Sequence, residues 1–198
     1  MTQPSISGKE QIKEAMRANP RPQLRRQLLQ SRQSTPIATR LAWDQSIAEQ
    51  VYTRVIAMNS QRLAVYWPIK GEPDLQTCYQ ALHQHGVRLA LPLVIGKGLA
   101  LRFVPWAPGD AMEPDDWGIP IPQQRDQELV VDTLLIPCVG FNTERYRLGY
   151  GGGFYDRSLA QMPQANTIGI AYQQAQVDFT HESYDIAMDC IVTEKGII

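Results

Sequence analysis

The feature that most constrains the fold is a continuous apolar run, LVVDTLLIP, at residues 129–137. A strand with one face in water alternates apolar and polar residues, whereas this run is apolar almost throughout. That pattern is typical of a strand covered on both faces. Such strands occur in parallel sheets with helices packed on either side. The run therefore predicts an α/β protein built around a mostly parallel sheet.

The rest of the chain alternates between strand-like and helix-like patterns. Apolar runs rich in β-branched or aromatic residues predict strands, and apolar residues at helical spacing predict helices. We expect strands at 62–67, 87–94, 99–106, 129–137, 167–172 and 190–193, and helices at 22–32, from Pro36, at 74–86 and at 154–161. This order predicts a single-domain, three-layer α/β sandwich.

Two further expectations concern the first half of the chain. The helix that starts at Pro36 should bury an apolar face made of Leu41, Ala48, Val51, Tyr52 and Val55. The segment 107–128 is rich in proline, acidic residues and glutamine, so we expect an irregular loop there.

Positive charge is concentrated near the N-terminus. Of the 19 Lys and Arg residues, eight lie within residues 1–40, where only two acidic residues occur, although the net charge of the chain is −1. We expect residues 1–20 to form a flexible basic arm and residues 21–198 to form the α/β domain. A basic arm suits an anionic partner, but a solvated helix face explains a charge run alone equally well.

Cysteine use and apolar runs indicate the compartment. The three cysteines, Cys78, Cys138 and Cys190, are far apart and show no CxxC spacing, which favours reduced thiols over disulfides or a zinc site. No apolar run reaches the roughly 18 residues that a membrane span needs, and no signal-peptide core follows the N-terminal charges. We expect a cytoplasmic protein without a membrane partner, acting as a monomer or weak dimer.

The segment RYRLGYGGGFYDRSLAQ, residues 145–161, holds the strongest functional signal. Its glycine loop follows the buried strand after a short connector and leads into a helix, so backbone N–H groups can face a phosphate. Arg145, Arg147 and Arg157 could add phosphate contacts. Phe154 stands where a GxGxxG dinucleotide motif needs glycine, and no GK[ST] of a P-loop follows.

The motif RLGYGGGFYDR closely resembles the glycine loop of the 5-formyltetrahydrofolate cyclo-ligase family, which typically reads R-[LI]-G-x-G-x-G-[YF]-Y-D. Five other segments resemble the family in the same order, from Arg21 to the end of the chain. They are RPQLRRQLLQSR, YWPIKGEPDL, WGIPIP, VDTLLIPCVGF and YDIAMDCIVTEKG.

The resemblance implies an ATP- and Mg²⁺-dependent enzyme with a single α/β domain. Members convert 5-formyltetrahydrofolate into 5,10-methenyltetrahydrofolate and release ADP and phosphate. Phosphorylation of the formyl oxygen makes a good leaving group, and the 10-nitrogen of the folate then closes the ring. Such phosphoryl transfer depends on positioning and charge neutralisation rather than on a covalent nucleophile.

The resemblance also implies a set of site residues. Arg21 and Arg25 match ATP-binding positions, and Arg21 stands where the family usually has lysine. Gly152 matches a position that is lysine in some relatives. ATP would be bound by Arg21, Arg25, Arg147, Leu148, Gly149, Tyr150, Gly151, Gly152, Gly153, Phe154 and Tyr155, with Arg147 and Tyr155 as the catalytic pair.

On the folate side, the resemblance implies a carboxylate and aromatic surfaces. Glu72 matches the glutamate that holds the substrate, and Asp156 and Asp189 match the Mg²⁺ positions. Folate would contact Trp67, Glu72, Trp117, Tyr150, Gly151, Gly152, Gly153 and Phe154. Taken without the resemblance, Trp67 fits a core residue equally well, and Asp189 is better explained as a structural residue.

Two other classes of protein are compatible with a glycine loop on an α/β scaffold. One is a non-catalytic relative that binds nucleotide or RNA through its basic arm, although we find no interleaved aromatic and basic pattern of an RNA-binding sheet. The other is a phosphosugar isomerase or acyl-transfer enzyme that needs no ATP. The presence of Glu72, Asp156 and Asp189 argues against the non-catalytic relative, and the length and order of the matched segments favour the cyclo-ligase over both, without a nucleic-acid partner.

Overall fold

The computed structural model describes residues 21–198, so the predicted basic arm at 1–20 lies outside the described residues. The chain forms four α-helices over this range, one 3₁₀ helix and eleven strands. In order they are α2 (Arg21–Ser34), α3 (Ile37–Ala57), β1 (Arg62–Ala64), α4 (Gln76–Gln84), β2 (Arg88–Val94), β3 (Leu101–Trp106), β4 (Met112–Pro114), β5 (Pro120–Pro122), β6 (Thr133–Pro137), β7 (Gly140–Phe141), β8 (Arg147–Leu148), α5 (Phe154–Gln161), β9 (Asn166–Ile170), η1 (Gln173–Ala175), β10 (Cys190–Thr193) and β11 (Gly196–Ile197).

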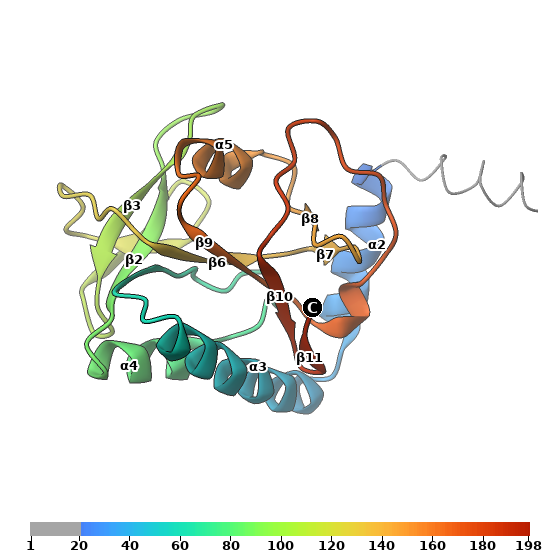
Figure 1. Cartoon of the computed structure of the whole chain (residues 1–198), viewed down its shortest axis with the longest axis horizontal. Helices are drawn as coiled ribbons and strands as arrows, with labels where there is room; N and C mark the ends of the chain where they lie inside the picture. Colours follow the sequence, from blue (N-terminus) through green and yellow to red (C-terminus); the bar gives the residue numbers. More distant parts are fainter. Residues whose placement is uncertain (1–20) are drawn as a thin grey trace, which may run out of the picture.

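A seven-stranded sheet forms the centre of the molecule, with the strand order β11-β10-β9-β6-β1-β2-β3. The five inner strands pair in parallel, and the two edge strands, β3 and β11, pair antiparallel with their neighbours. The sheet runs through the middle of the view in Figure 1, with helices on both sides. The predicted α/β class and the mostly parallel sheet are confirmed.

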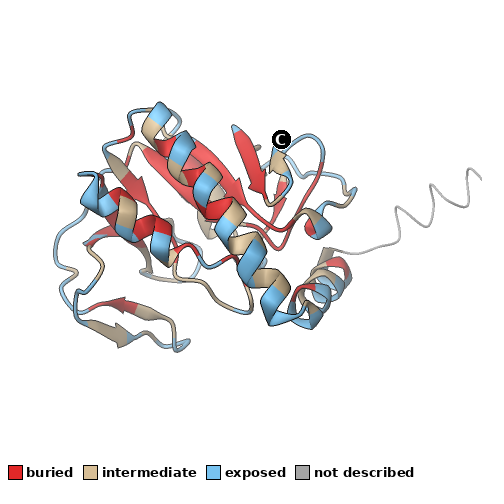
Figure 2. Ribbon diagram, turned by 90° about the horizontal axis from the view of Figure 1, so that it is seen from below, coloured by how far each residue is buried: buried red, intermediate tan, exposed pale blue. Residues whose placement is uncertain are grey.

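Strand β6 is buried on both faces, as its apolar run predicted. Successive side chains of a strand point to opposite faces. Leu135 joins one core cluster, whereas Leu134 and Ile136 join the other. Both clusters extend across the neighbouring strands, and Figure 2 shows the buried sheet beneath α3 and α4. A continuous apolar run is therefore required here, because neither face of β6 meets water.

The helices divide between the two faces of the sheet. Helices α3 and α4 contribute Ile47, Val51 and Tyr79 to the first cluster, and α5 contributes Leu159 to the second. This division follows from the chain path. From β1 the chain passes through α4 to β2 on one side, and from β6 it passes through α5 to β9 on the other. Right-handed crossovers in opposite directions cover opposite faces, which produces the predicted three layers.

The chain path also decides where a ligand can bind. Strands β1 and β6 are neighbours in the sheet, yet the connections that leave them run in opposite directions. The loops beyond their carboxyl ends therefore diverge and leave a crevice. In open α/β sheets this reversal of strand order is where ligands bind.

Several predicted elements differ from the structure. The predicted irregular loop at 107–128 contains a small hairpin, β4–β5. Its strands are short and contain proline, which is rare in strands, so the sequence pattern did not predict them. The predicted apolar face of the third helix is wrong at Leu41, which is 64% exposed because it precedes the part of α3 that packs on the sheet. Strands β1 and β6 are shorter than predicted: β6 begins at Thr133 rather than at residue 129, and Val130 in the predicted part is 71% exposed. The two-residue strands β7, β8 and β11 were not predicted.

Within residues 21–198, none of the helices combines the length and apolar character that a membrane span requires.

Gly169 lies in the middle of β9, and its lack of a side chain is a packing requirement. A Cβ atom there would lie 2.3 Å from Ile191 Cδ1 and 3.2 Å from Cys138 Sγ. We expect Gly169→Ala to lower the free energy of unfolding by about 1–3 kcal/mol, because overpacking a dense core forces neighbours to shift. Urea denaturation measures this loss.

Gly96→Ala is the matched control for this substitution. Its added Cβ would meet only the side chain of Leu99, at 3.0 Å, and Leu99 is exposed and free to rotate away. If Gly169→Ala were as stable as Gly96→Ala, the result would contradict the close packing of β9 against β10 at Gly169.

Candidate functional site

A pocket opens beyond the carboxyl ends of the inner strands, at the reversal between β1 and β6. Its walls come from the start of α2, the segment after β1, strands β2 and β3, the β4–β5 hairpin, the end of β6, the glycine loop with the first turn of α5, and the segment before β10. The residues used below that line it are Arg21, Arg25, Tyr66, Trp67, Glu72, Asp115, Arg147, Gly149–Asp156 and Asp185.

The glycine loop forms one wall because its backbone takes conformations that favour glycine. Gly151 has a φ of +97° and Gly153 a φ of +66°, both in the left-handed region. Gly153 is also the residue before the first turn of α5, so the loop turns sharply into that helix. Arg25 Nε donates a hydrogen bond to the Gly149 carbonyl at 2.8 Å, which links the loop to α2.

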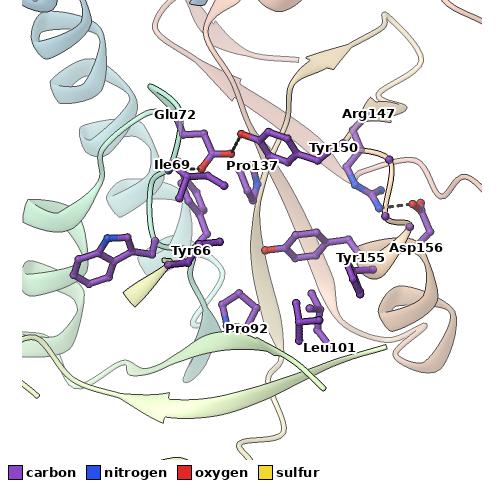
Figure 3. Close-up of a pocket in the computed structure, with 18 of the residues that line it drawn as sticks. Tyr66, Ile69, Glu72, Pro92, Leu101, Pro137, Arg147, Tyr150, Tyr155 and Asp156 are labelled. Carbon is purple, nitrogen blue, oxygen red and sulfur yellow. Dashed lines mark hydrogen bonds and ion pairs between the residues drawn. The ribbon is translucent and has the colours of Figure 1, made fainter. Parts of the chain in front are cut away.

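Of the three arginines that flank the glycines, only Arg147 lines the pocket. Arg145 donates to the Met188 carbonyl, and Arg157 donates to the carbonyls of Leu99 and Gly152, so both stabilise the loop from outside. Arg147 is buried, and its guanidinium pairs with Asp156 at 2.8 Å, as Figure 3 shows. The predicted role of Arg145 and Arg157 in the site is therefore not supported by their contacts.

A second arginine–carboxylate pair lies beside the first. Arg21 pairs with Asp185 and approaches Glu182 at 3.6 Å. Burial is the largest influence on Asp185 and raises its pKa. The hydrogen bonds from Arg21 and from the Glu182 backbone N–H, together with the charges of Arg21 and Arg147, outweigh burial, so the pKa lies below its ordinary value. The Ile186 backbone N–H, next in the chain, donates to Asp156 at 3.3 Å, so the two carboxylates belong to one network.

Arg25 differs from these two arginines. Among the contacts of the described residues it has no carboxylate within salt-bridge distance, and its hydrogen bond goes to a carbonyl. Burial and the neighbouring charge of Arg21 lower its pKa, although an arginine remains protonated. A partly buried guanidinium without a counter-ion at a pocket wall is suited to an anionic ligand.

Glu72 stands on the opposite wall of the pocket from the Arg147–Asp156 pair (Figure 3). It follows β1 and is only 4% exposed. One carboxylate oxygen accepts from the Ile69 backbone N–H at 2.8 Å, and the other accepts from the Tyr150 hydroxyl at 2.7 Å. Burial raises the pKa of Glu72 despite these hydrogen bonds.

Aromatic and apolar groups line the part of the pocket between these polar walls. Trp67 lines the pocket and packs edge-on against Trp106, with ring centroids 6.1 Å apart. Tyr155 lines it as well, and burial raises the pKa of its phenol well above the ordinary value, so the hydroxyl remains protonated. Such a surface suits a flat heterocycle.

Besides Arg145 and Arg157, three predicted site residues do not line the pocket. Leu148 is buried beneath the glycine loop as part of β8. Trp117 is 64% exposed at the turn of the β4–β5 hairpin, beside the lining residue Asp115. Asp189 accepts two hydrogen bonds from Thr167 at the start of β9 and β10, which is the amino end of these strands. The structure thus does not bring Asp189 together with Asp156.

The sequence reasoning missed two residues: Asp185, which lines the pocket, and Arg32, which donates a hydrogen bond to the lining residue Tyr150. Asp185 lies in the same YDIAMD segment as Asp189, and the pattern alone does not say which aspartate faces the pocket. Arg32 lies on the helix face of α2 that also carries Arg25, seven residues earlier, and that spacing was a usable signal. Among the described residues, no group of three or more His, Cys, Asp or Glu side chains is arranged to hold a metal by itself.

A pocket at the strand-order reversal, with a glycine loop and three arginines on its walls, defines a class: α/β proteins that bind phosphorylated ligands. The chain belongs to the 5-formyltetrahydrofolate cyclo-ligase family, whose model matches residues 17–194. The match begins before Arg21, where we expected the resemblance to start.

Individual relatives agree with this assignment. The chain is 30% identical to a 5-formyltetrahydrofolate cyclo-ligase of Mycoplasma pneumoniae, over 87% of this chain and 97% of the relative. It is 27% identical to that of Haemophilus influenzae, with the same coverage. Among solved structures, 5,10-methenyltetrahydrofolate synthetases of M. pneumoniae and Aquifex aeolicus superpose with TM-scores of 0.71 and 0.73, at 30% and 28% identity. The M. pneumoniae match covers 88% of this chain and 98% of the relative. The A. aeolicus match covers 89% of this chain and 91% of the relative.

The raised pKa of Glu72 predicts a pH dependence of stability. The folded protein holds the proton of Glu72 more tightly than the unfolded chain does. The stabilisation from this proton is complete below the ordinary value of 4.5 and is lost as the pH rises through the folded pKa. We expect the unfolding free energy of the wild type, relative to Glu72→Gln, to fall as the pH rises from about 4 to 7. Urea denaturation at several pH values measures this difference.

Glu128→Gln serves as the control, because Glu128 is an exposed carboxylate away from the pocket. If Glu72→Gln and Glu128→Gln had the same pH dependence, Glu72 would not be held in the buried environment described above.

Proposed function

We propose that the protein is a 5-formyltetrahydrofolate cyclo-ligase that uses ATP and Mg²⁺. It converts 5-formyltetrahydrofolate into 5,10-methenyltetrahydrofolate and releases ADP and phosphate. The observation that carries the proposal is one pocket with a phosphate-type wall and a carboxylate–aromatic wall facing each other. Membership of the family supports the same reaction.

The ATP phosphates bind along the glycine loop in this proposal. Arg25 has no carboxylate partner among residues 21–198, and Arg21 and Arg147 exchange their carboxylates for phosphate oxygens. The loop backbone from Arg147 to Tyr155 supplies N–H donors, and Gly152 does so where some relatives have lysine. Arg21 carries the charge of the usual lysine with a planar fork of donors. The burial of Arg147 supports this role, because a desolvated guanidinium binds phosphate strongly.

The carboxylates released from the arginines suit Mg²⁺. Mg²⁺ is commonly held by one or two carboxylates together with substrate phosphates. Asp156 and Asp185 both line the pocket, whereas Asp189 is bound to Thr167 at the other end of the strands. We therefore propose Asp156 and Asp185 as the Mg²⁺ ligands, in place of the predicted pair with Asp189. The ion would neutralise charge on the transferring phosphoryl group.

The folate binds between Glu72 and the aromatic surface. Glu72 accepts hydrogen bonds from N–H groups of the pterin ring, and Trp67 and Tyr150 provide flat surfaces beside it. Phe154 and the glycines Gly151–Gly153 line the side next to ATP. Trp117 is exposed at the rim, so a contact with folate would involve the outer part of that molecule.

Two bond exchanges complete the reaction. The formyl oxygen attacks the γ-phosphorus of ATP, the bond from that phosphorus to the β–γ bridging oxygen breaks, and ADP leaves. The 10-nitrogen then attacks the formyl carbon and loses its proton to water. The bond from that carbon to the phosphorylated oxygen breaks, and inorganic phosphate leaves. Arg147 stabilises the negative charge of the transferred group. Tyr155, whose hydroxyl stays protonated, donates a hydrogen bond to it.

The setting of the enzyme also remains a proposal. The three cysteines are all buried and free, which is the usual state in a reducing cytoplasm. The expectations of a monomer or weak dimer, and of no nucleic-acid or membrane partner, stay predictions.

The reaction is tested by absorbance in the near ultraviolet, where the conjugated methenyl product absorbs and the formyl substrate does not. We expect an absorbance rise that requires both ATP and Mg²⁺. Asp156→Ala should reduce the rate about a hundredfold or more, because even outer-shell changes at metal sites cost 10- to 100-fold. A folded, ATP-binding wild type that gives no rise would contradict the reaction and favour the non-catalytic relative.

The choice between two aspartates is tested with matched variants. Asp185→Asn should raise the Mg²⁺ concentration needed for half-maximal activity by about tenfold or more, because it removes a charged ligand. Asp189→Asn keeps an acceptor for Thr167 and should leave that concentration unchanged. The reverse result would restore Asp189 as the metal ligand.

A further inference from the structure

Arg32 is a buried arginine on α2 that lies outside the pocket lining. It is 4% exposed, and each of its three nitrogens has a partner. Nε donates to the Lys70 carbonyl at 3.2 Å, and the two terminal nitrogens donate to the Cys138 carbonyl at 3.4 Å and to the Tyr150 hydroxyl at 2.7 Å. One side chain thus connects the segment after β1, the end of β6 and the glycine loop.

Burial of this charge is not explained by stability alone. The closest carboxylate oxygen is that of Glu72, 4.0 Å from Arg32, which is too far for a direct hydrogen bond. Desolvating an arginine is costly, and apolar side chains often fill such positions with equal or greater stability. The guanidinium therefore suggests a use other than holding α2 in place.

The contacts form a chain of hydrogen bonds with a fixed direction. An arginine can only donate, so the Tyr150 oxygen accepts from Arg32 and its own hydrogen must point elsewhere. That hydrogen goes to Glu72 Oε1 at 2.7 Å, while the Ile69 N–H binds Oε2 at 2.8 Å. Both carboxylate oxygens are thus held in place from behind, and Glu72 lines the pocket (Figure 3).

We propose that Arg32 is a positioning residue that, through Tyr150, keeps Glu72 charged and oriented toward the ligand, and couples that carboxylate to the glycine loop. The identity of the ligand as a reduced folate rests on the proposed function. The state of Glu72 itself is a property of the free protein, so it can be measured without any activity.

The surroundings of Glu72 support this role. Burial is the main influence and raises the pKa of Glu72, while the Ile69 and Tyr150 hydrogen bonds and the charges of Arg32 and Lys70 lower it. Lys70 is exposed to solvent, which screens its charge. Arg32 is therefore the main desolvated positive charge. The other titratable groups that act on or near Glu72 are neutral phenols and a thiol: Tyr66, Tyr79, Tyr150, Tyr155 and Cys138.

The first test follows the pKa of Glu72 in the free protein by NMR of ¹³C-labelled glutamate side chains, with Glu72→Gln to identify the signal. We expect Arg32→Met to raise this pKa by about one pH unit, because it removes an opposite charge about 4 Å away. Tyr150→Phe should raise it too. Arg26→Met, on the exposed face of the same helix, should leave it unchanged.

The second test measures kcat/KM for 5-formyltetrahydrofolate as a function of pH. In Arg32→Met the acidic limb of the profile should move up by the same amount as the NMR pKa. Arg32→Lys keeps the positive charge but lacks the planar set of guanidinium donors, so it should move the acidic limb less than Arg32→Met does. A residue that only stabilised the fold would lower the profile at all pH values without moving the limb, and that result would overturn the proposal.

The two tests separate the two proposals. An unchanged Glu72 pKa in both Arg32→Met and Tyr150→Phe would overturn the role of Arg32, whatever the activity. If Arg32→Met shifts the pKa of Glu72 but the wild-type protein lacks cyclo-ligase activity, the role of Arg32 is supported and the proposed function is contradicted. Should Arg32→Met fail to fold, Arg32→Lys and Tyr150→Phe provide the same readouts.

Discussion

The two-sided burial of β6 is the constraint on which the rest of the structure depends. β6 lies inside the sheet, with β1 on one side and β9 on the other, and both of its faces are covered. The connections that leave β1 and β6 run in opposite directions along the sheet. The reversal opens the crevice beyond Pro137, where the pocket lies. The apolar core and the ligand site are therefore two consequences of one arrangement of strands.

Two arginine–carboxylate pairs balance most of the charge in the pocket. Arg147 and Arg21 are held by Asp156 and Asp185, so neither the cations nor the carboxylates are buried without a partner. In the proposed complex, Mg²⁺ would supply positive charge to the carboxylates, and the ATP phosphates would supply negative charge to the arginines. Each member of the two ion pairs would then exchange one partner of opposite charge for another. The opposite wall is arranged differently. Tyr150 donates a hydrogen bond to Glu72, while Arg32 binds Tyr150 and lies 4.0 Å from the carboxylate, without a direct hydrogen bond to it.

Much of the fold could be predicted because its signals are local. The limits of α5, from Phe154 to Gln161, and of β10, from Cys190 to Thr193, agree with the sequence pattern. The glycine loop was found because its glycines are adjacent in sequence. The failures are equally instructive. Leu41 has the right helical spacing but lies beyond the part of α3 that meets the sheet, and spacing alone carries no information about where a neighbour ends.

The sequence by itself determined the class of fold, the order of its main elements and the family, because periodicity, apolar runs and an unbroken motif are properties of neighbouring residues. Only the tertiary structure decided which of two nearby aspartates faces the pocket, and that Asp189 instead binds Thr167. It also decided that Arg32, 40 residues before Glu72, supports that carboxylate through Tyr150. The physical reason is that side-chain direction and burial depend on segments that meet only when the sheet has formed.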